Sequence, residues 1–255
     1  MEYETYLPYE GFVYDDLIVD ENDNFTEISH IGFFDEMFSY LAVSEADVNW
    51  MSVTPSEIET MQSAIEQVKG KVVCYGLGLG YFAYMASIKN DVESVTIIEK
   101  DTNIVALFND CILPQFSNQD KIKIIVSDAF DYAKTDMVKE QYDYAFVDLW
   151  HNAGDGLGLY LRMKELEHYN PDTTFLYWLE TSILTILRRC ILIILNEQMN
   201  GTTDEDYEKA ENDNDIVINR LYKYLHDYQI NNYYDICSLI KDSSLKNIAK
   251  NLKKE

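Results

Sequence analysis

The sequence has little of what builds cross-linked or metal-bound proteins. It contains only 4 Cys, 10 Gly and 4 Pro among 255 residues. The four cysteines are far apart and none forms a CxxC pair. Three of the histidines, His30, His168 and His226, have no Cys or carboxylate at ligand spacing. We therefore expect no disulfide framework and no metal site, and the scarcity of Gly and Pro indicates an ordered globular chain.

Basic residues are also scarce, with 20 Lys and Arg against 45 Asp and Glu and a formal net charge of -25. Only Lys250, Lys253 and Lys254 at the end of the chain come close to a basic run. Because a nucleic-acid binder needs a positive surface, this charge argues against DNA or RNA as a partner. A solvated acidic surface is the favoured explanation, and attraction of a cationic partner or an amine substrate is the alternative.

No apolar stretch is long enough to cross a bilayer. The longest, Ile183 to Leu195, is interrupted by Arg188 and Arg189. The first residues, MEYETYLPYE, lack the basic and apolar regions of a signal peptide. We expect a cytoplasmic protein that does not associate with membranes, and the sequence is compatible with a homodimer.

The middle of the chain alternates between strand-like and helix-like patterns. The strand-like runs are short, apolar and β-branched, which is typical of strands that are covered on both faces. This alternation predicts βαβ units and a mainly parallel sheet with helices on both faces. The predicted strands are 72–76, 94–99, 121–126, 144–149 and 174–178, and the predicted helices between them are 80–89, 102–112, 129–139 and 158–169.

The flanking regions have a different character. Two β-prone runs around Asn22-Asp23-Asn24 predict a hairpin. Thr54, Pro55 and Glu57 form a capping-box pattern for a helix that ends at Gly70. After Glu180 we expect a buried helix and then two further helices, 181–199, 216–229 and 234–252, the last interrupted near Ser243. The predicted regions are an N-terminal hairpin and lead region (1–52), an α/β region (53–180) and a helical C-terminal extension (181–255).

A glycine-rich loop, Gly76-Leu-Gly78-Leu-Gly80, directly follows the first strand of the alternating region. Glycines allow a tight turn and let a ligand approach the backbone. The loop fits two frames. Gly76-x-Gly78-x-Gly80 is found in methyltransferases, whereas Gly78-x-Gly80-x-x-Ala83 fits the dinucleotide fingerprint. A tight turn without a ligand is the structural alternative.

Acidic residues stand at the carboxyl ends of the next three strands, where open α/β sheets bind ligands. Glu99 can accept both hydrogen bonds of a ribose diol, and Asp128 can accept from an adenine amine. Asp148 can lie near a positively charged methionine end, which a dinucleotide does not have. For Asp101, which follows Glu99 closely, we prefer a helix-capping role.

These motifs together resemble those of class I S-adenosylmethionine-dependent methyltransferases, in the spermidine-synthase-like branch. The resemblance is carried by GLGLG, IIEKD, SDAFDYA and YDYAFVDLW and covers roughly residues 50–180. It implies a Rossmann-like α/β fold and S-adenosylmethionine as the cofactor. It also implies that Gly76, Gly78 and Gly80 line the methionine part, that Glu99 holds the ribose, and that Asp128 and Ala129 hold the adenine.

Two departures from that family matter. Aminopropyltransferases carry a second Asp three residues after the one that ends the fourth strand, and here that position is His151, which leaves Asp155 as a replacement. The usual closing antiparallel strand pair has no counterpart after residue 178, so we expect either a truncated sheet or a sheet whose last strands are replaced.

The segment after the fourth strand supplies the candidate substrate residues. His151 is a candidate general base, with an ordinary loop histidine as the equal alternative. Trp150 can shape a substrate pocket, although packing is favoured for it. The glycines around Asp155 predict either a flexible lid or a simple connector.

The function predicted from these residues is a methyltransferase that acts on a small or peptide-like acceptor, with Asp148 and His151 as catalytic residues and Asp155 and Trp150 at the acceptor. The alternatives are a non-catalytic S-adenosylmethionine-binding protein and an aminopropyltransferase-like enzyme. An NAD-dependent oxidoreductase is the less favoured hypothesis.

Overall fold

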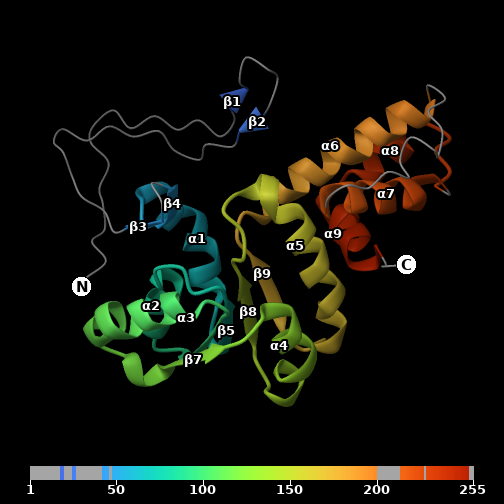
Figure 1. The fold of residues 1–255 in the computed structure, drawn as a ribbon. Coiled ribbons are helices and arrows are strands. Elements are labelled where there is room, and N and C mark those ends of the chain that lie inside the picture. The colour runs from blue at the N-terminus through green and yellow to red at the C-terminus, as the bar shows by residue number, and fades with distance from the viewer. Residues whose placement is uncertain are drawn as a thin grey trace. The chain divides into compact units, whose positions relative to one another are not determined.

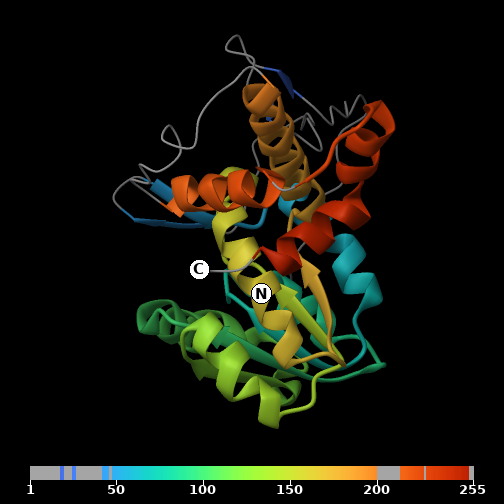
Figure 2. The ribbon, with the colours of Figure 1, turned by 90° about the vertical axis from the view of Figure 1, so that its right-hand side faces the viewer.

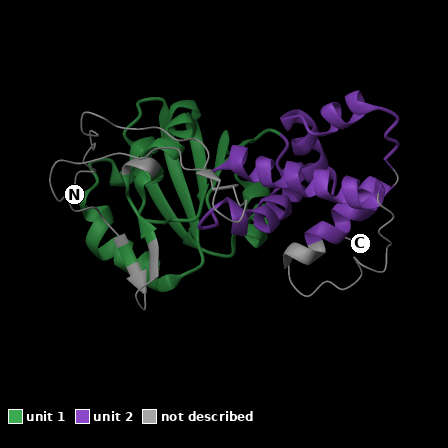
Figure 3. Ribbon diagram, turned by 90° about the horizontal axis from the view of Figure 1, so that it is seen from above, with its two compact units in different colours: residues 1–148, 172–178 green, residues 149–171, 179–255 purple. Residues whose placement is uncertain are grey.

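The structure is a computed structural model that describes residues 18–19, 25–26, 42–45, 48–199, 213–226 and 228–252. The chain forms two compact units (Figure 3). The sheet unit comprises residues 1–148 and 172–178, and the helical unit comprises residues 149–171 and 179–255. The contacts therefore group residues 149–171 with the C-terminal helices. The regional boundaries at 52 and 180 stay predictions.

Five parallel strands form the centre of the sheet unit, in the order β7-β6-β5-β8-β9 (Figure 1). This order, with the first strand of the alternating region in the middle, is that of a Rossmann-like α/β fold. The predicted fold class is therefore confirmed. The strands are β5 (Gly70–Tyr75), β6 (Val92–Glu99), β7 (Ile122–Val126), β8 (Tyr144–Val147) and β9 (Thr174–Tyr177).

Helices cover both faces of this sheet. Cys74 lies opposite Phe146 in the register of β5 and β8, so the two share a face, and Tyr75 points to the other face. Phe146 stacks on Phe82 of α2 with ring centroids 3.9 Å apart. Tyr75 makes an edge contact with Tyr132 of α4 at 6.3 Å. Hence α2 (Tyr81–Ser87) and α4 (Ala129–Thr135) pack on opposite faces of the strands.

The helix that precedes β5 begins as the capping-box pattern predicts. Thr54 is the N-cap of α1 (Pro55–Gln67), and its side chain accepts from the backbone N–H of Glu57 while Glu57 bonds back. The other helices of the sheet unit are shorter than predicted. The range 102–112 divides into α3 (Thr102–Leu107) and a π-helical turn (Phe108–Ile112). The range 129–139 divides into α4 and a 3-10 turn (Met137–Lys139).

Short antiparallel strand pairs precede α1. β1 (Ile18–Val19) pairs with β2 (Phe25–Thr26), which confirms the predicted hairpin, although its turn at residues 22–24 lies outside the described residues. β3 (Ala42–Glu45) pairs with β4 (Val48–Ser52), and the sequence analysis did not predict this second pair.

The longest helix of the helical unit is α6 (Glu180–Met199), drawn in orange in Figure 2, and it packs against α5 (Ala153–Leu166), α7 and α9. α7 (Asp213–His226), α8 (Tyr233–Leu239) and α9 (Asp242–Asn251) follow, and the predicted interruption falls at 240–241, a little before Ser243. Only helices follow β9 in the described part of the chain, as expected from the absence of a closing strand pair in the sequence after residue 178. No helix among the described residues combines the length and apolar character that a membrane span needs.

The prediction of a flexible loop or connector at residues 154–158 was wrong, because these residues lie in the first turns of α5 (Ala153–Leu166). Asn152 caps the helix, and Asp155 completes a capping box with it. Gly156 is required by packing rather than by flexibility, since a Cβ there would lie 2.8 Å from the Trp150 ring. Capping therefore starts the helix despite three glycines that lower its intrinsic propensity.

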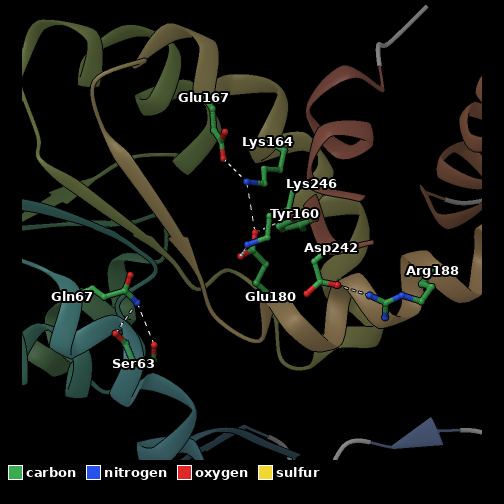
Figure 4. A network of polar contacts seen from close by, with 9 residues as sticks. All are labelled: Ser63, Gln67, Tyr160, Lys164, Glu167, Glu180, Arg188, Asp242 and Lys246. Atoms are coloured by element: carbon green, nitrogen blue, oxygen red, sulfur yellow. Dashed lines mark hydrogen bonds and ion pairs between the residues drawn. The ribbon is translucent and has the colours of Figure 1, made fainter. Parts of the chain in front are cut away.

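A partly buried charge network joins three elements of the helical unit (Figure 4). Lys164 of α5 is buried, and its ammonium lies 2.7 Å from the carboxylate of Glu167 and 3.6 Å from that of Glu180. Glu180 also accepts from the Tyr160 hydroxyl at 3.0 Å and pairs with Lys246 of α9 at 2.6 Å. Glu180 thus links α5, α6 and α9.

Candidate functional site

The glycine-rich loop after β5 depends on left-handed backbone conformations. Gly76, Gly78 and Gly80 have φ values of 94°, 53° and 78°. L-residues with a side chain rarely adopt these angles, so each position favours glycine. The loop leaves β5 and enters α2 within five residues, as its spacing predicted.

Two of these glycines differ in what surrounds them. A Cβ on Gly80 would lie 2.3 Å from the ring of Phe108, so this position is needed for the packing of the π-helical turn. Among the residues that the structure describes, none has an atom within 4 Å of a Cβ placed on Gly78. A ligand group can therefore approach the backbone at Gly78, and a side chain at this position would block that approach.

The loop lies at the point where the strand order of the sheet reverses. Strands β6 and β7 follow on one side of β5, and β8 and β9 on the other. Because Tyr75 is in register with both Ile98 and Val147, Gly76 stands between Glu99 and Asp148. The two carboxylate residues are thus separated by two strand spacings, or roughly 10 Å at the backbone. Ligands bind open α/β sheets at this switch point.

Glu99 lies next to the glycine-rich loop and also holds that loop in place through a hydrogen bond. Its Oε2 accepts the backbone N–H of Leu77 at 3.1 Å, and its Oε1 accepts that of Asp101 at 2.8 Å. Each carboxylate oxygen can accept a further hydrogen bond, so a ribose diol could still bind. Asp101 caps α3 by accepting from Asn103 at 2.8 Å, which confirms the capping role preferred for it.

Asp148 follows β8 and is partly buried at the same edge, where its backbone N–H donates to Tyr75. Desolvation, together with the negative charge of Glu57, raises the pKa of Asp148 to about 7. A carboxyl group with this pKa exchanges its proton near neutral pH and is suited either to proton transfer or to binding a cation.

Glu57 is the residue at this edge that the sequence analysis missed. Its carboxylate accepts from the Ser52 hydroxyl at 3.0 Å and from the Thr54 backbone N–H at 3.3 Å. Burial nevertheless raises its pKa, because desolvation outweighs those hydrogen bonds. The capping box already accounted for Glu57, and no local sequence signal places it near Asp148.

Cys74 lies under the loop and is not a candidate nucleophile. Its thiol is buried and donates to the carbonyl oxygen of Gly76 at 3.1 Å. Burial, reinforced by the charges of Asp148 and Glu99, raises the pKa of this thiol well above its usual range. A thiol of this kind stays protonated and serves packing.

Asp128 caps α4 in the structure. Its Oδ1 accepts from the backbone N–H groups of Phe130 at 2.9 Å and Asp131 at 3.1 Å. Both cap bonds use the same oxygen, and the side chain is exposed. Ala129, the first residue of α4, is buried. The adenine contact assigned to these two residues stays a prediction.

His151 and Asp155 come together at the start of α5. The His151 Nδ1 lies 3.1 Å from Asp155 Oδ2, and Asp155 also accepts from the backbone N–H of Asn152 at 2.9 Å. Burial works to raise the pKa of Asp155, but the hydrogen bonds from Asn152 and His151 outweigh it and lower the pKa. The carboxylate is therefore ionised and accepts from Nδ1–H, so the lone pair of the neutral imidazole is on Nε2.

Trp150 lies beside this pair in the chain and is buried, with 6% of its surface exposed. The pyrrole part of its ring lies against Gly156, whose absent Cβ would be 3.0 Å from Cδ1. Its indole N–H has no hydrogen-bond partner among the described residues. Asp148 belongs to the sheet unit, whereas Trp150, His151 and Asp155 belong to the helical unit, so the predicted convergence of these residues stays a prediction.

No protein-family model and no curated protein matches this sequence. Among solved structures, the chain is similar to spermidine synthase from Thermotoga maritima, with 14% sequence identity and a TM-score of 0.38. The match covers 69% of this chain and 66% of that chain, so this chain spans just under two thirds of its length. The fold assignment rests on the strand order and register described above.

Proposed function

We propose that this protein is an S-adenosylmethionine-dependent transferase that methylates a small or peptide-like acceptor. The observation that carries the proposal is the open backbone at Gly78, in a loop flanked by Glu99 and Asp148 at the switch point of the sheet. A nucleoside with a cationic amino-acid tail matches this arrangement, because it offers a diol to one carboxylate and a positive charge to the other.

Each part of the site would then have a separate task. Glu99 would accept the ribose hydroxyls while holding Leu77 in place. The backbone of Gly76 to Gly80 would lie along the methionine part, and Asp148 would balance its positive charge. Asp128 and Ala129 would border the adenine. When bound, S-adenosylmethionine supplies a methyl group made electrophilic by its sulfonium.

Electrostatics favours this ligand over a nicotinamide dinucleotide. A pyrophosphate carries negative charge and needs donors or cations around the loop. Here Asp148 follows the neighbouring strand, and Glu57 adds a second carboxylate close enough to affect its pKa. These charges would repel a pyrophosphate and attract a sulfonium or ammonium group.

The protein offers two groups for proton transfer. Asp148 has a pKa of about 7, and His151 is held in one tautomer by Asp155. In methyl transfer the principal tasks of a protein are to position the two reactants and to exclude water. We assign His151 to the removal of a proton from the acceptor, and Asp148 to the binding of positive charge.

Calorimetric titration with four ligands tests the proposal. S-adenosylmethionine and S-adenosylhomocysteine should bind, and NAD should not. Tight binding of NAD alone would contradict the proposal and favour an oxidoreductase. Preferential binding of decarboxylated S-adenosylmethionine would favour aminopropyl transfer instead. Binding without transfer of a tritiated methyl group to any peptide or amine pool would leave a cofactor-binding protein.

A further inference from the structure

The open position at Gly78 lies inside a tight turn of the glycine-rich loop. The backbone N–H of Gly80 donates to the carbonyl oxygen of Leu77 at 2.9 Å, so Gly78 and Leu79 are the two central residues of a four-residue turn. Of these two, only Gly78 has a positive φ, 53°. This pattern fits a type II′ turn, which favours glycine at its first central position. The shape of the turn therefore determines how the backbone at Gly78 faces a ligand.

One segment, which runs from Glu99 through α3 to Phe108, holds both ends of this turn. At the start of the segment, Oε2 of Glu99 accepts the N–H of Leu77 at 3.1 Å. At its end, the Phe108 ring lies against Gly80, where a Cβ would be 2.3 Å from Cε2 and 3.0 Å from Cζ. Glycine lets the ring pack directly on the backbone. Because a helix that Asp101 caps joins the two contacts, their separation is fixed.

The helix changes its geometry at Phe108. The N–H of Phe108 donates to the carbonyl oxygens of Ile104 and Val105. Its own carbonyl oxygen accepts from Leu113, five residues further on, as the first bond of the π-helical turn. Such turns are rare and often occur at functional sites. The ring is fully buried and makes an edge contact with Phe116, with centroids 5.6 Å apart. It is therefore fixed by its surroundings and acts on a ligand through the loop.

We infer that Phe108 is a positioning residue, which together with Glu99 holds the turn in the shape that presents Gly78 to the ligand. The inference rests on the proposed function and adds to it a residue that sets ligand affinity without touching the ligand. A loop that is already ordered loses less conformational entropy on binding, so this support strengthens binding. Without the ring, Gly80 can leave its left-handed conformation, because glycine has many others to adopt.

Three variants of the full chain separate this role from ordinary packing. Phe108→Leu removes the ring edge that touches Gly80 and leaves a cavity there. Phe108→Met keeps more of the buried volume but replaces a rigid ring by a flexible chain, so it tests the role in a better packed protein. Val105→Ala is the matched control, because Val105 is buried on α3 one turn before Phe108 and its truncation also weakens the packing of that helix. Urea unfolding measures the stability that each variant loses.

Calorimetry with S-adenosylhomocysteine measures affinity, and amide hydrogen exchange of the unliganded protein measures how well the turn is held. We expect both Phe108 variants to weaken binding about tenfold, and Val105→Ala to change it less than about twofold. In the Phe108 variants the N–H groups of Leu77 and Gly80, which are hydrogen-bonded in the turn, should exchange roughly fivefold faster through local opening. Val105→Ala should leave these two exchange rates nearly unchanged, although it destabilises the same helix.

Two results would overturn the inference while leaving the proposed function intact. One is an unchanged dissociation constant for S-adenosylhomocysteine in a folded Phe108 variant. The other is an equal loss of affinity in Val105→Ala, which would show that any loosening of α3 has the same effect. Absence of binding by the wild-type protein would instead overturn the proposed function. The exchange rates of Leu77 and Gly80 would then still decide whether Phe108 holds the turn.

Discussion

The carboxylate of Glu99, at the end of β6, accepts the backbone N–H of Leu77 in the glycine-rich loop at 3.1 Å. Its second oxygen accepts from Asp101 at 2.8 Å, so one side chain ties two strand-end loops together. The residue that we expect to hold the ribose therefore also sets the shape of the loop that faces the methionine part.

Glu99→Ala should weaken S-adenosylhomocysteine binding by roughly 1–3 kcal/mol, because ligand hydroxyls and two backbone N–H groups lose their acceptor. The matched control is Asp101→Ala, which removes the cap of α3. That control should cost about 1 kcal/mol of stability with binding nearly unchanged. Calorimetry and urea unfolding measure the two quantities. An unchanged dissociation constant in folded Glu99→Ala would remove Glu99 from the site.

Two glycines of the same loop should respond differently to substitution. Gly80→Ala should lower the free energy of unfolding by roughly 2–4 kcal/mol, because it adds left-handed strain and a clash with Phe108. Gly78→Ala has the same kind of strain but open space around it, so it should cost only about 1 kcal/mol. Thermal unfolding of the two variants measures the difference. The double variant Gly80→Ala with Phe108→Leu should recover part of the stability that Gly80→Ala loses.

The same loop gives a binding prediction. Gly78→Val should abolish S-adenosylhomocysteine binding in a protein that remains folded, because the branched side chain occupies the space where the ligand meets the backbone. Normal binding by Gly78→Val would show that the loop is a structural turn only.

Asp148 should make stability and ligand binding respond to pH in opposite directions. Its pKa rises from 3.8 to about 7 in the folded protein, so between these values the folded state holds a proton that the unfolded state has lost. Stability therefore falls as pH rises through this window. Affinity for S-adenosylmethionine should rise near pH 7, as the carboxylate that binds its positive charge becomes ionised.

Asp148→Asn tests both parts. It should stabilise the folded protein by roughly 1–3 kcal/mol at pH values above about 7, because it removes the buried negative charge that the carboxylate carries there, and it should weaken S-adenosylmethionine binding. Unfolding and calorimetry at a series of pH values measure the two effects. If the Asp148→Asn variant were no more stable and bound the ligand equally well, the carboxylate would have neither role.

The charge network of the helical unit predicts a large stability effect at Lys164. Lys164→Met should lower the free energy of unfolding by roughly 3 kcal/mol, since it removes the buried positive charge that lies between the carboxylates of Glu167 and Glu180. Lys139→Met, which breaks an exposed pair with Asp136, should leave it nearly unchanged. Equal effects of the two substitutions would show that burial does not strengthen the network.

Much of the fold could be predicted from the sequence because its signals are local. The alternation of apolar strands and helices determined the parallel sheet, and Thr54 with Glu57 determined where α1 begins. The five-residue loop from Gly76 to Gly80 placed the candidate site, since only glycine adopts its backbone angles readily. Each of these features depends on residues close together in the chain.

Only the tertiary structure decided what each of these residues contacts. It showed that Gly80 is needed for packing against Phe108, whereas the space beside Gly78 is not filled by any described residue. It brought Glu57 of α1 near enough to Asp148 to affect its pKa, and it turned the glycines after Asn152 into the first turns of α5. Packing, burial and electrostatic interaction depend on distances in space, and residues far apart in the chain carry no local sign of them.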